Sequence, residues 1–177
     1  MTSAESPTRV AVVTGASSGI GEATAKTLAA QGFHVVCVAR RADRINALAE
    51  QIGGTPAVMD VTDLAAVEAL AQRLDRVDVL VNNAGGAKGL EPVAEADIEH
   101  WRWMWETNVL GTLYLTRALL PKLVASGDGL IVTITSIAAF EIYDGGAGYT
   151  SAKHAQSALH QTLRGELLGK PVRLTEI

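Results

Sequence analysis

The sequence predicts a three-layer α/β fold in which a doubly wound parallel sheet lies between two layers of helices. Three observations support this prediction. Short runs rich in Val, Ile and Leu alternate with segments of helical periodicity along the chain. These runs are almost continuously apolar, which is typical of strands covered on both faces. A glycine-rich turn follows the first of them.

The predicted strands are residues 9–14, 34–39, 55–61, 77–82, 129–135 and 171–177, and the predicted helices are 20–31, 41–52, 62–74, 96–126 and 147–169. Gly32 and Gly53 stand where C-terminal caps of the first two helices are expected, and Thr62 is a candidate N-terminal cap of the third. Because strands and helices alternate strictly, the crossovers should be right-handed, and a ligand should bind beyond the carboxyl ends of the strands.

The chain has the size and composition of one globular domain, with 177 residues of which 48% are hydrophobic. We expect residues 1–177 to form a single domain in which residues 1–8 are a flexible tail. The net charge is −4, and the 15 Lys and Arg residues are spread along the chain. This distribution argues against nucleic-acid and anionic-membrane partners.

The predicted location is the cytoplasm. The first residues lack the apolar region of a signal peptide, and no run reaches the roughly 18 apolar residues of a membrane span. Cys37, the single cysteine, lies in the apolar run HVVCVA and fits a core residue in a reducing compartment. The four histidines show no ligand spacing, so we expect no metal site.

The glycine-rich turn, TGASSGIGEA at residues 14–23, has glycines at positions 15, 19 and 21. A tight turn from a strand into a helix lets the backbone approach a pyrophosphate closely, and the helix N-terminus attracts anions. Three glycines alone are a weak signal, but their place after the first strand predicts a dinucleotide-binding loop.

The end of the second strand should select between the two nicotinamide cofactors. Ala39 is followed there by Arg40 and Arg41, not by an acidic residue. Cations at a helix N-terminus oppose its dipole by up to about 1 kcal/mol each, and a 2′-phosphate would supply the compensating anion. We therefore predict NADP, with solvated surface arginines as the alternative. Asp60, after the third strand, could meet the adenine ring or cap the next helix.

Tyr149 and Lys153 are four residues apart in the last predicted helix, so both side chains lie on one face. Ser136 ends the fifth predicted strand at the same edge of the sheet. Ionising a phenol at neutral pH costs about 4 kcal/mol. An ammonium group about 4 Å away supplies about as much at an effective dielectric near 20. The serine could hydrogen-bond a substrate oxygen beside the tyrosine.

Together these residues resemble the short-chain dehydrogenase/reductase family, in its compact single-domain branch with a Rossmann-type fold. The resemblance covers residues 9–177 and rests on TGASSGIG at 14–21, DV at 60–61, NNAG at 82–85, TNVLG at 107–111, Ser136, and YTSAK at 149–153. It implies that Tyr149 is the catalytic acid/base and that Lys153 favours its ionised form and binds the nicotinamide ribose. It also implies that Ser136 positions the carbonyl and that Asn108 holds a water in a proton relay.

The cofactor-binding residues that the resemblance implies are Gly15, Ser17, Ser18, Gly19, Ile20, Gly21, Arg40, Arg41, Asp60, Val61, Asn82, Ala84, Gly85, Tyr149 and Lys153. Among them, Asn82 resembles a strand-bracing asparagine with a mainly structural role. A finer likeness, in residues 82–92 and 100–124 and in the loop before Tyr149, is to NADP-dependent 3-hydroxy acid dehydrogenases, which include enzymes oxidising serine and allo-threonine. The implied reaction is hydride transfer between NADP and a small hydroxyl or carbonyl substrate.

The chain departs from this family at its end. It stops at PVRLTEI, so the C-terminal strand and the substrate loop of the family are expected to be missing. This leaves a second hypothesis open, namely a nucleotide-binding regulatory or scaffolding protein of the same fold without turnover.

The resemblance further implies a homodimer or homotetramer formed through the long helices 96–126 and 147–169. Trp101, Trp103 and Trp105 cannot share one face of a helix. One face therefore meets either a local loop or a subunit interface.

Overall fold

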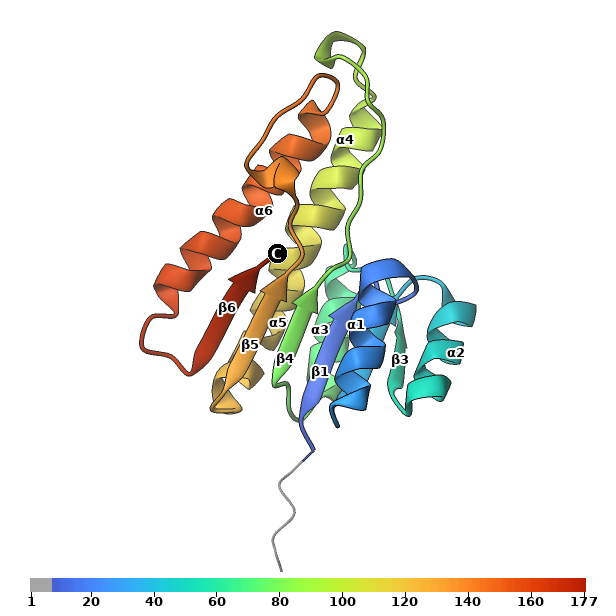
Figure 1. The fold of residues 1–177 in the computed structure, drawn as a ribbon, viewed down its shortest axis with the longest axis vertical. Helices are drawn as coiled ribbons and strands as arrows, with labels where there is room; N and C mark the ends of the chain where they lie inside the picture. The colour runs from blue at the N-terminus through green and yellow to red at the C-terminus, as the bar shows by residue number, and fades with distance from the viewer. Residues whose placement is uncertain (1–7) are drawn as a thin grey trace, which may run out of the picture.

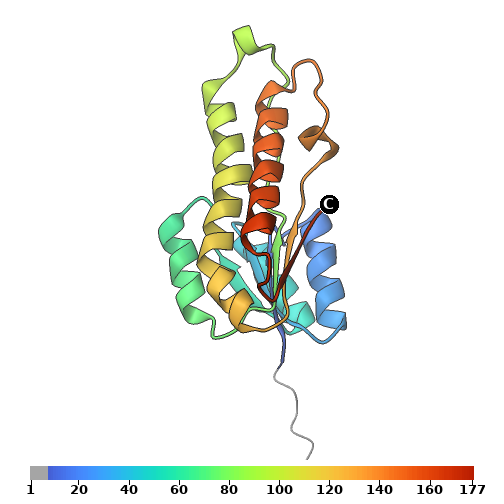
Figure 2. The ribbon, with the colours of Figure 1, turned by 90° about the vertical axis from the view of Figure 1, so that its left-hand side faces the viewer.

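The computed structural model describes residues 8–177, and these form one parallel sheet with helices on both faces (Figures 1 and 2). The six strands lie in the order β3-β2-β1-β4-β5-β6. Their bounds are β1 Val10–Thr14, β2 His34–Ala39, β3 Thr55–Val58, β4 Val79–Asn82, β5 Gly129–Thr133 and β6 Val172–Glu176. The predicted doubly wound α/β fold is therefore confirmed. Of the predicted tail, residues 1–7 lie outside the described part of the chain.

The helices follow the predicted order, with bounds α1 Gly19–Ala30, α2 Ala42–Ile52, α3 Leu64–Arg73, α4 Ile98–Trp105, α5 Gly111–Ala125 and α6 Ala147–Glu166. Gly53 caps α2 with a left-handed backbone, as predicted. The capping role predicted for Thr62 is wrong. The third helix begins at Leu64, and its cap is Asp63, whose carboxylate accepts from the Ala66 N–H at 3.1 Å.

The predicted helix 96–126 is divided. A π-helical turn, Glu106–Leu110, separates α4 from α5. Such turns contain one residue more than an α-helical turn, and they are frequent at functional sites. Periodicity alone did not reveal this turn, because the apolar pattern continues through it.

Two apolar layers hold the sheet between the helices. On one face, strand residues pack against α3 and α5, and on the other they pack against α1 and α2. Leu115, Leu119 and Leu123 of α5 are at most 1% exposed. Figure 2 shows the sheet edge-on, with α3, α5 and α6 on one side and α1 on the other. Among residues 8–177, every helix falls short of the length and apolarity that crossing a bilayer requires.

One half of the molecule is taller than the other. Figure 1 shows α4 and the first turns of α6 rising above the carboxyl ends of β4, β5 and β6, whereas α1 and α2 stay level with β1 to β3. The loops after β4 and β5 climb along this raised part. The step between the two halves lies where the fold predicts a ligand.

Candidate active site

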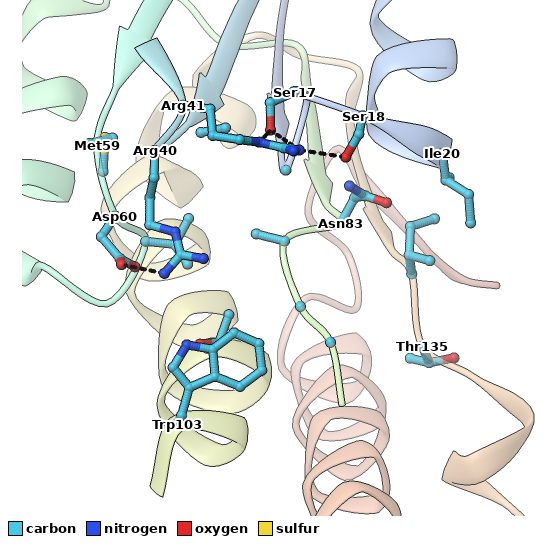
Figure 3. Close-up of a pocket in the computed structure, with 18 of the residues that line it drawn as sticks. Ser17, Ser18, Ile20, Arg40, Arg41, Met59, Asp60, Asn83, Trp103 and Thr135 are labelled. Carbon is cyan, nitrogen blue, oxygen red and sulfur yellow. Dashed lines mark hydrogen bonds and ion pairs between the residues drawn. The ribbon is translucent and has the colours of Figure 1, made fainter. Parts of the chain in front are cut away.

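A cavity of about 580 Å³ opens at the carboxyl ends of the strands (Figure 3). Twelve of the predicted site residues line it, namely Gly15, Ser17, Ser18, Ile20, Arg40, Arg41, Asp60, Val61, Ala84, Gly85, Tyr149 and Lys153. Eight further lining residues were not predicted, namely Ala39, Met59, Asn83, Gly86, Trp103, Thr107, Ile134 and Thr135. The predicted residues Gly19, Gly21, Asn82, Asn108 and Ser136 lie outside the lining set.

The first loop has the geometry of an anion cradle. Gly15 and Gly19 have φ values of 64° and 56°, which lie in the left-handed region that favours glycine. Helix α1 begins after Ser18 without a side-chain cap, so the N–H groups of its first turn remain free for a ligand. A Cβ atom at Gly21 would lie 2.5 Å from the Gly15 carbonyl oxygen. Gly21 therefore serves the close packing of helix and loop.

Arg41 reaches back across this loop. Its Nη2 donates to the Ser17 and Ser18 hydroxyls at 2.8 and 2.7 Å, and its Nε donates to the Ser17 hydroxyl at 3.1 Å. Figure 3 shows the Arg41 guanidinium extended toward Ser17 and Ser18. Two hydroxyls and one guanidinium thus converge on a point beside the helix N-terminus, which suits a phosphate.

Arg40 points elsewhere. Its Nη1 lies 3.3 Å from an Asp60 carboxylate oxygen, and its side chain is 62% exposed. Asp60 also accepts from the Thr62 N–H and hydroxyl, both at 3.0 Å. Asp60 therefore fixes the turn after β3 and lines the cavity, while Asp63 caps the helix. The alternative in which Asp60 caps that helix is wrong.

The loop after β4 is held by Thr14, a residue that the sequence did not single out. The Thr14 hydroxyl accepts from the N–H groups of Asn83 and Ala84, both at 2.9 Å, and donates to the Val81 carbonyl at 3.1 Å. The Asn83 side chain donates to the Thr14 carbonyl at 2.8 Å. The end of β1 thus shapes the wall of the cavity. The signal for Asn83 was its place directly after a buried strand.

Asn82, the residue before it, is buried and donates from Nδ2 to the Thr116 hydroxyl at 2.9 Å. This hydrogen bond joins β4 to α5. Asn108 lies in the π-helical turn and is fully buried. Its amide exchanges two hydrogen bonds with the Gly86 backbone, at 3.1 and 2.9 Å, so it ties the loop to the turn.

Tyr149 and Lys153 lie on the same face of α6, as predicted. The Lys153 Nζ is 5.7 Å from the centre of the Tyr149 ring. It donates to the Ile134 carbonyl at 3.1 Å and to the Gln156 side chain at 2.8 Å. Lys153 is 4% exposed, and its burial lowers its pKa to about 8. A buried ammonium beside a phenol at the wall of a cavity is an arrangement suited to acid/base chemistry.

The burial of Lys153 predicts a pH-dependent stability. In the folded protein Lys153 loses its proton near pH 8, whereas in the unfolded chain it keeps the proton up to a pKa near 10.5. The cost of burying the charge is therefore fully present below about pH 8 and is relieved as the pH rises toward about 10. The unfolding free energy of the wild type should gain up to about 3 kcal/mol over this range relative to Lys153→Met, as measured by urea unfolding.

The matched control for this prediction is Lys170→Met, because Lys170 is exposed in the turn after α6. This variant should follow the wild-type dependence on pH. Parallel curves for the wild type and Lys153→Met would contradict the prediction.

Ser136 lies beyond the strand that was predicted to end with it. β5 ends at Thr133, and Ser136 caps a short 3₁₀ turn, Ile137–Ala139, by accepting from the Ala138 N–H at 3.1 Å. Its neighbour Thr135 lines the cavity. Beyond the end of β5, the backbone pairing with the last residues of the chain continues as a hydrogen bond from the Thr135 N–H to the Ile177 carbonyl.

The three tryptophans are divided between different surroundings. Trp103 lines the cavity, and the Lys88 Nζ lies 4.4 Å from the centre of its ring. Trp101 faces α6 at Gly148, where an added Cβ would lie 3.0 Å from the indole nitrogen. Trp105 is 40% exposed. The contact of Trp103 with the loop after β4 fits the local alternative for one face of the helix.

Within residues 8–177, histidine, cysteine and acidic side chains form no group of three that could hold a metal ion. The residues present do fit a dinucleotide. The cradle of the first loop and Arg41 provide for phosphate, and Asp60, Met59 and Val61 provide a partly apolar wall beside Arg40. The cavity continues from there to Tyr149 and Lys153.

Comparisons with known proteins identify the family of the chain. The family described as short chain dehydrogenase matches residues 9–177. An uncharacterized oxidoreductase of Mycobacterium tuberculosis is 82% identical over all 177 residues, which are 70% of the relative. The NADP-dependent 3-hydroxy acid dehydrogenase of Salmonella typhimurium is 39% identical over 174 residues, covering 95% of this chain and 70% of the relative.

The solved structures agree. The crystal structure of serine dehydrogenase from Escherichia coli has a TM-score of 0.90 and 37% identity, covering 94% of this chain and 80% of that one. The closed form of serine dehydrogenase complexed with NADP+ has a TM-score of 0.91 and 37% identity, covering 94% and 70%. On the strength of the family match and of these relatives, the chain belongs to the short-chain dehydrogenase family.

Proposed function

We propose that this oxidoreductase uses NADP and transfers a hydride between the nicotinamide and a small hydroxyl or carbonyl substrate. The observation that carries the proposal is one continuous cavity. It joins the Arg41–Ser17–Ser18 cluster at one end to Tyr149 and Lys153 at the other. A bound dinucleotide placed along it would bring its reactive ring to the phenol and its phosphates to the first loop.

Arg41 supports NADP over NAD. Its guanidinium already bonds two hydroxyls, so a 2′-phosphate arriving there meets a preformed set of donors. Solved relatives complexed with NADP point the same way. When bound, the nicotinamide supplies the hydride chemistry. The residues of the chain bind and orient the reactants and move the proton.

The proposed roles follow from position. Tyr149, at the cavity wall, exchanges a proton with the substrate oxygen, and the ammonium of Lys153 lies beside its ring. Ser136 holds the substrate oxygen once its hydroxyl turns from the Ala138 N–H toward the cleft. Asn108 acts through the π-helical turn, where its side chain fixes the loop at Gly86.

The proposed substrate is a 3-hydroxy acid, a class suggested by relatives named as 3-hydroxy acid and serine dehydrogenases. The test is a panel of serine, other 3-hydroxy acids and plain secondary alcohols, followed by the absorbance of NADPH. Turnover of the acids above that of the alcohols supports the proposal. Tight NADPH binding without turnover of any member would favour the nucleotide-binding regulatory or scaffolding alternative.

We also propose that copies of the protein associate as a dimer or tetramer through α5 and α6. A largely apolar hollow of about 400 Å³ lies between these helices, and its lining includes Leu113, Leu120, Leu159 and Leu163. Leu113→Asp should lower the mass measured by light scattering, because a carboxylate would be buried at the contact. Leu168→Asp, in the exposed turn after α6, is the control. A monomeric wild type would contradict this proposal.

A further inference from the structure

A buried chain of hydrogen bonds leads from Lys153 to the π-helical turn through residues that lie outside the cavity lining. Gln156, one turn further along α6, is 0% exposed. Its Oε1 accepts from the Lys153 Nζ at 2.8 Å, and its Nε2 donates to the Thr112 hydroxyl on α5 at 2.9 Å. The Thr112 hydroxyl in turn donates to the carbonyl of Asn108 at 2.8 Å. Three bonds therefore connect the ammonium to the π-helical turn.

The direction of each bond is determined by the next. The Asn108 carbonyl can only accept, so the single hydroxyl proton of Thr112 is used there. The Thr112 oxygen must then accept from Gln156, which orients the amide with its oxygen toward Lys153. A glutamine turned the other way would present N–H groups to an ammonium. Thr112 thus selects the orientation of Gln156 that binds a positive charge.

The same geometry limits the freedom of Lys153. An ammonium carries three N–H donors, and two of them are directed to the Ile134 carbonyl and to Gln156. One donor remains for the cavity that Lys153 lines. A flexible lysine would otherwise distribute its donors among many rotamers.

A purely structural role would not require this chemistry. An apolar side chain at position 156 would fill the contact between α5 and α6 without any polar group to satisfy. A fully buried amide is costly unless it is hydrogen-bonded, and one of its partners is the ammonium of the candidate site.

We propose that Gln156, oriented by Thr112, is a positioning residue that keeps Lys153 charged and aims its remaining N–H at the cavity. For its consequence in catalysis this inference rests on the proposed function. Its consequence for Lys153 itself does not.

The hydrogen-bond partners of Lys153 are uncharged, so a shift in its titration midpoint can be attributed to the substitution that is made. Tyr149 and His154 are its titratable neighbours on the same helix, and His154 is exposed, with its Nδ1 2.8 Å from the Thr150 carbonyl oxygen. The end of β5 presents the Ile134 carbonyl, the π-helical turn presents Asn108, and the loop after β4 presents the Gly85 backbone. His160, further along α6, and Glu176 of β6 are also titratable, and they interact with each other.

The test is the titration of Lys153 in the full chain without cofactor, followed by NMR of ¹³C-labelled lysine side chains and assigned with Lys153→Met. Gln156→Leu removes the acceptor, so the midpoint should fall by about one pH unit or more. Gln156→Glu keeps an acceptor and adds a negative charge, so the midpoint should rise. Thr112→Val should shift the midpoint in the same direction as Gln156→Leu, and Thr112→Ser should restore the wild-type value.

The matched control is Ser157→Ala. Ser157 is the buried neighbour of Gln156, but its hydroxyl donates to Glu176 at 2.8 Å, away from Lys153. This variant should lose stability and leave the midpoint unchanged. A wild-type midpoint in both Gln156→Leu and Thr112→Val would overturn the inference. Should Gln156→Leu fail to fold, the Thr112→Val and Thr112→Ser pair decides alone.

A second arm separates this inference from the proposed function. In an active enzyme, the pH profile of kcat should shift with the Lys153 midpoint across the same variants. A midpoint that shifts in a protein without turnover would leave the positioning role standing and remove the oxidoreductase proposal. A midpoint that stays fixed across the variants of an active enzyme would overturn the positioning role and leave the oxidoreductase proposal standing.

Discussion

Tyr149→Phe is expected to lower kcat by about a thousandfold, within the range that general acid/base groups contribute. The phenyl ring keeps the packing against Lys153 and the cavity wall but has no hydroxyl to exchange a proton with the substrate oxygen. NADPH affinity should change little, because the residues proposed to hold its phosphates and adenosine line the other end of the cavity. Steady-state kinetics on the best substrate of the panel, with a fluorescence titration of NADPH, measures both quantities.

The control for this experiment is Tyr114→Phe. Tyr114 lies on α5 and packs against the apolar core, outside the cavity lining. The Tyr114→Phe variant also loses one phenolic hydroxyl, but it should keep the wild-type activity. Turnover at the wild-type rate in Tyr149→Phe would remove the acid/base role and with it the proposed mechanism.

Arg41→Ala should weaken NADPH binding by about 10- to 100-fold while NADH binding stays nearly unchanged. The reason is the convergence of its guanidinium with the Ser17 and Ser18 hydroxyls, where we propose that the 2′-phosphate, which NADH lacks, is bound. Arg40→Ala should have the smaller effect, because Arg40 is directed to Asp60 and is largely exposed. Fluorescence titrations with both cofactors measure the difference.

Arg44→Ala provides a matched control, since Arg44 is exposed on α2 one turn beyond Arg41. It should bind both cofactors as the wild type does. Equal affinity of the wild type for NADPH and NADH would sink the phosphate assignment. A larger loss of NADPH affinity in Arg40→Ala than in Arg41→Ala would assign the 2′-phosphate to Arg40 instead of Arg41.

Local sequence signals predicted much of this molecule correctly. The order of strands and helices followed from the alternation of apolar runs, and the first loop followed from glycines whose backbone angles suit few other residues. Tyr149 and Lys153 were placed together by helix spacing alone. The errors at element ends also have local causes. Thr62 and Asp63 are adjacent candidate caps, and spacing cannot choose between them.

The features that were missed depend on contacts between distant segments. Thr14 acts on the backbone of residues 83 and 84, and Trp103 reaches the cavity only because the π-helical turn and the loop after β4 bring it there. Gln156 was not singled out in the sequence, because its role depends on Thr112 of another helix, to which it donates a hydrogen bond. Arg40 and Arg41 are adjacent residues of the same type, so the sequence could not distinguish them. In the structure Arg40 contacts Asp60, whereas Arg41 binds the hydroxyls of the first loop.

The π-helical turn Glu106–Leu110 has a mechanical consequence for the rod formed by α4 and α5. One additional residue rotates whatever follows by about 100° relative to a regular helix. One face of α4 can therefore pack against α6, while a different face of α5 packs against the sheet and α3. The turn therefore separates the orientation of α4 from that of α5, so substitutions on α4 need not disturb the packing of α5 on the sheet. A single deletion in the turn would couple the two ends again.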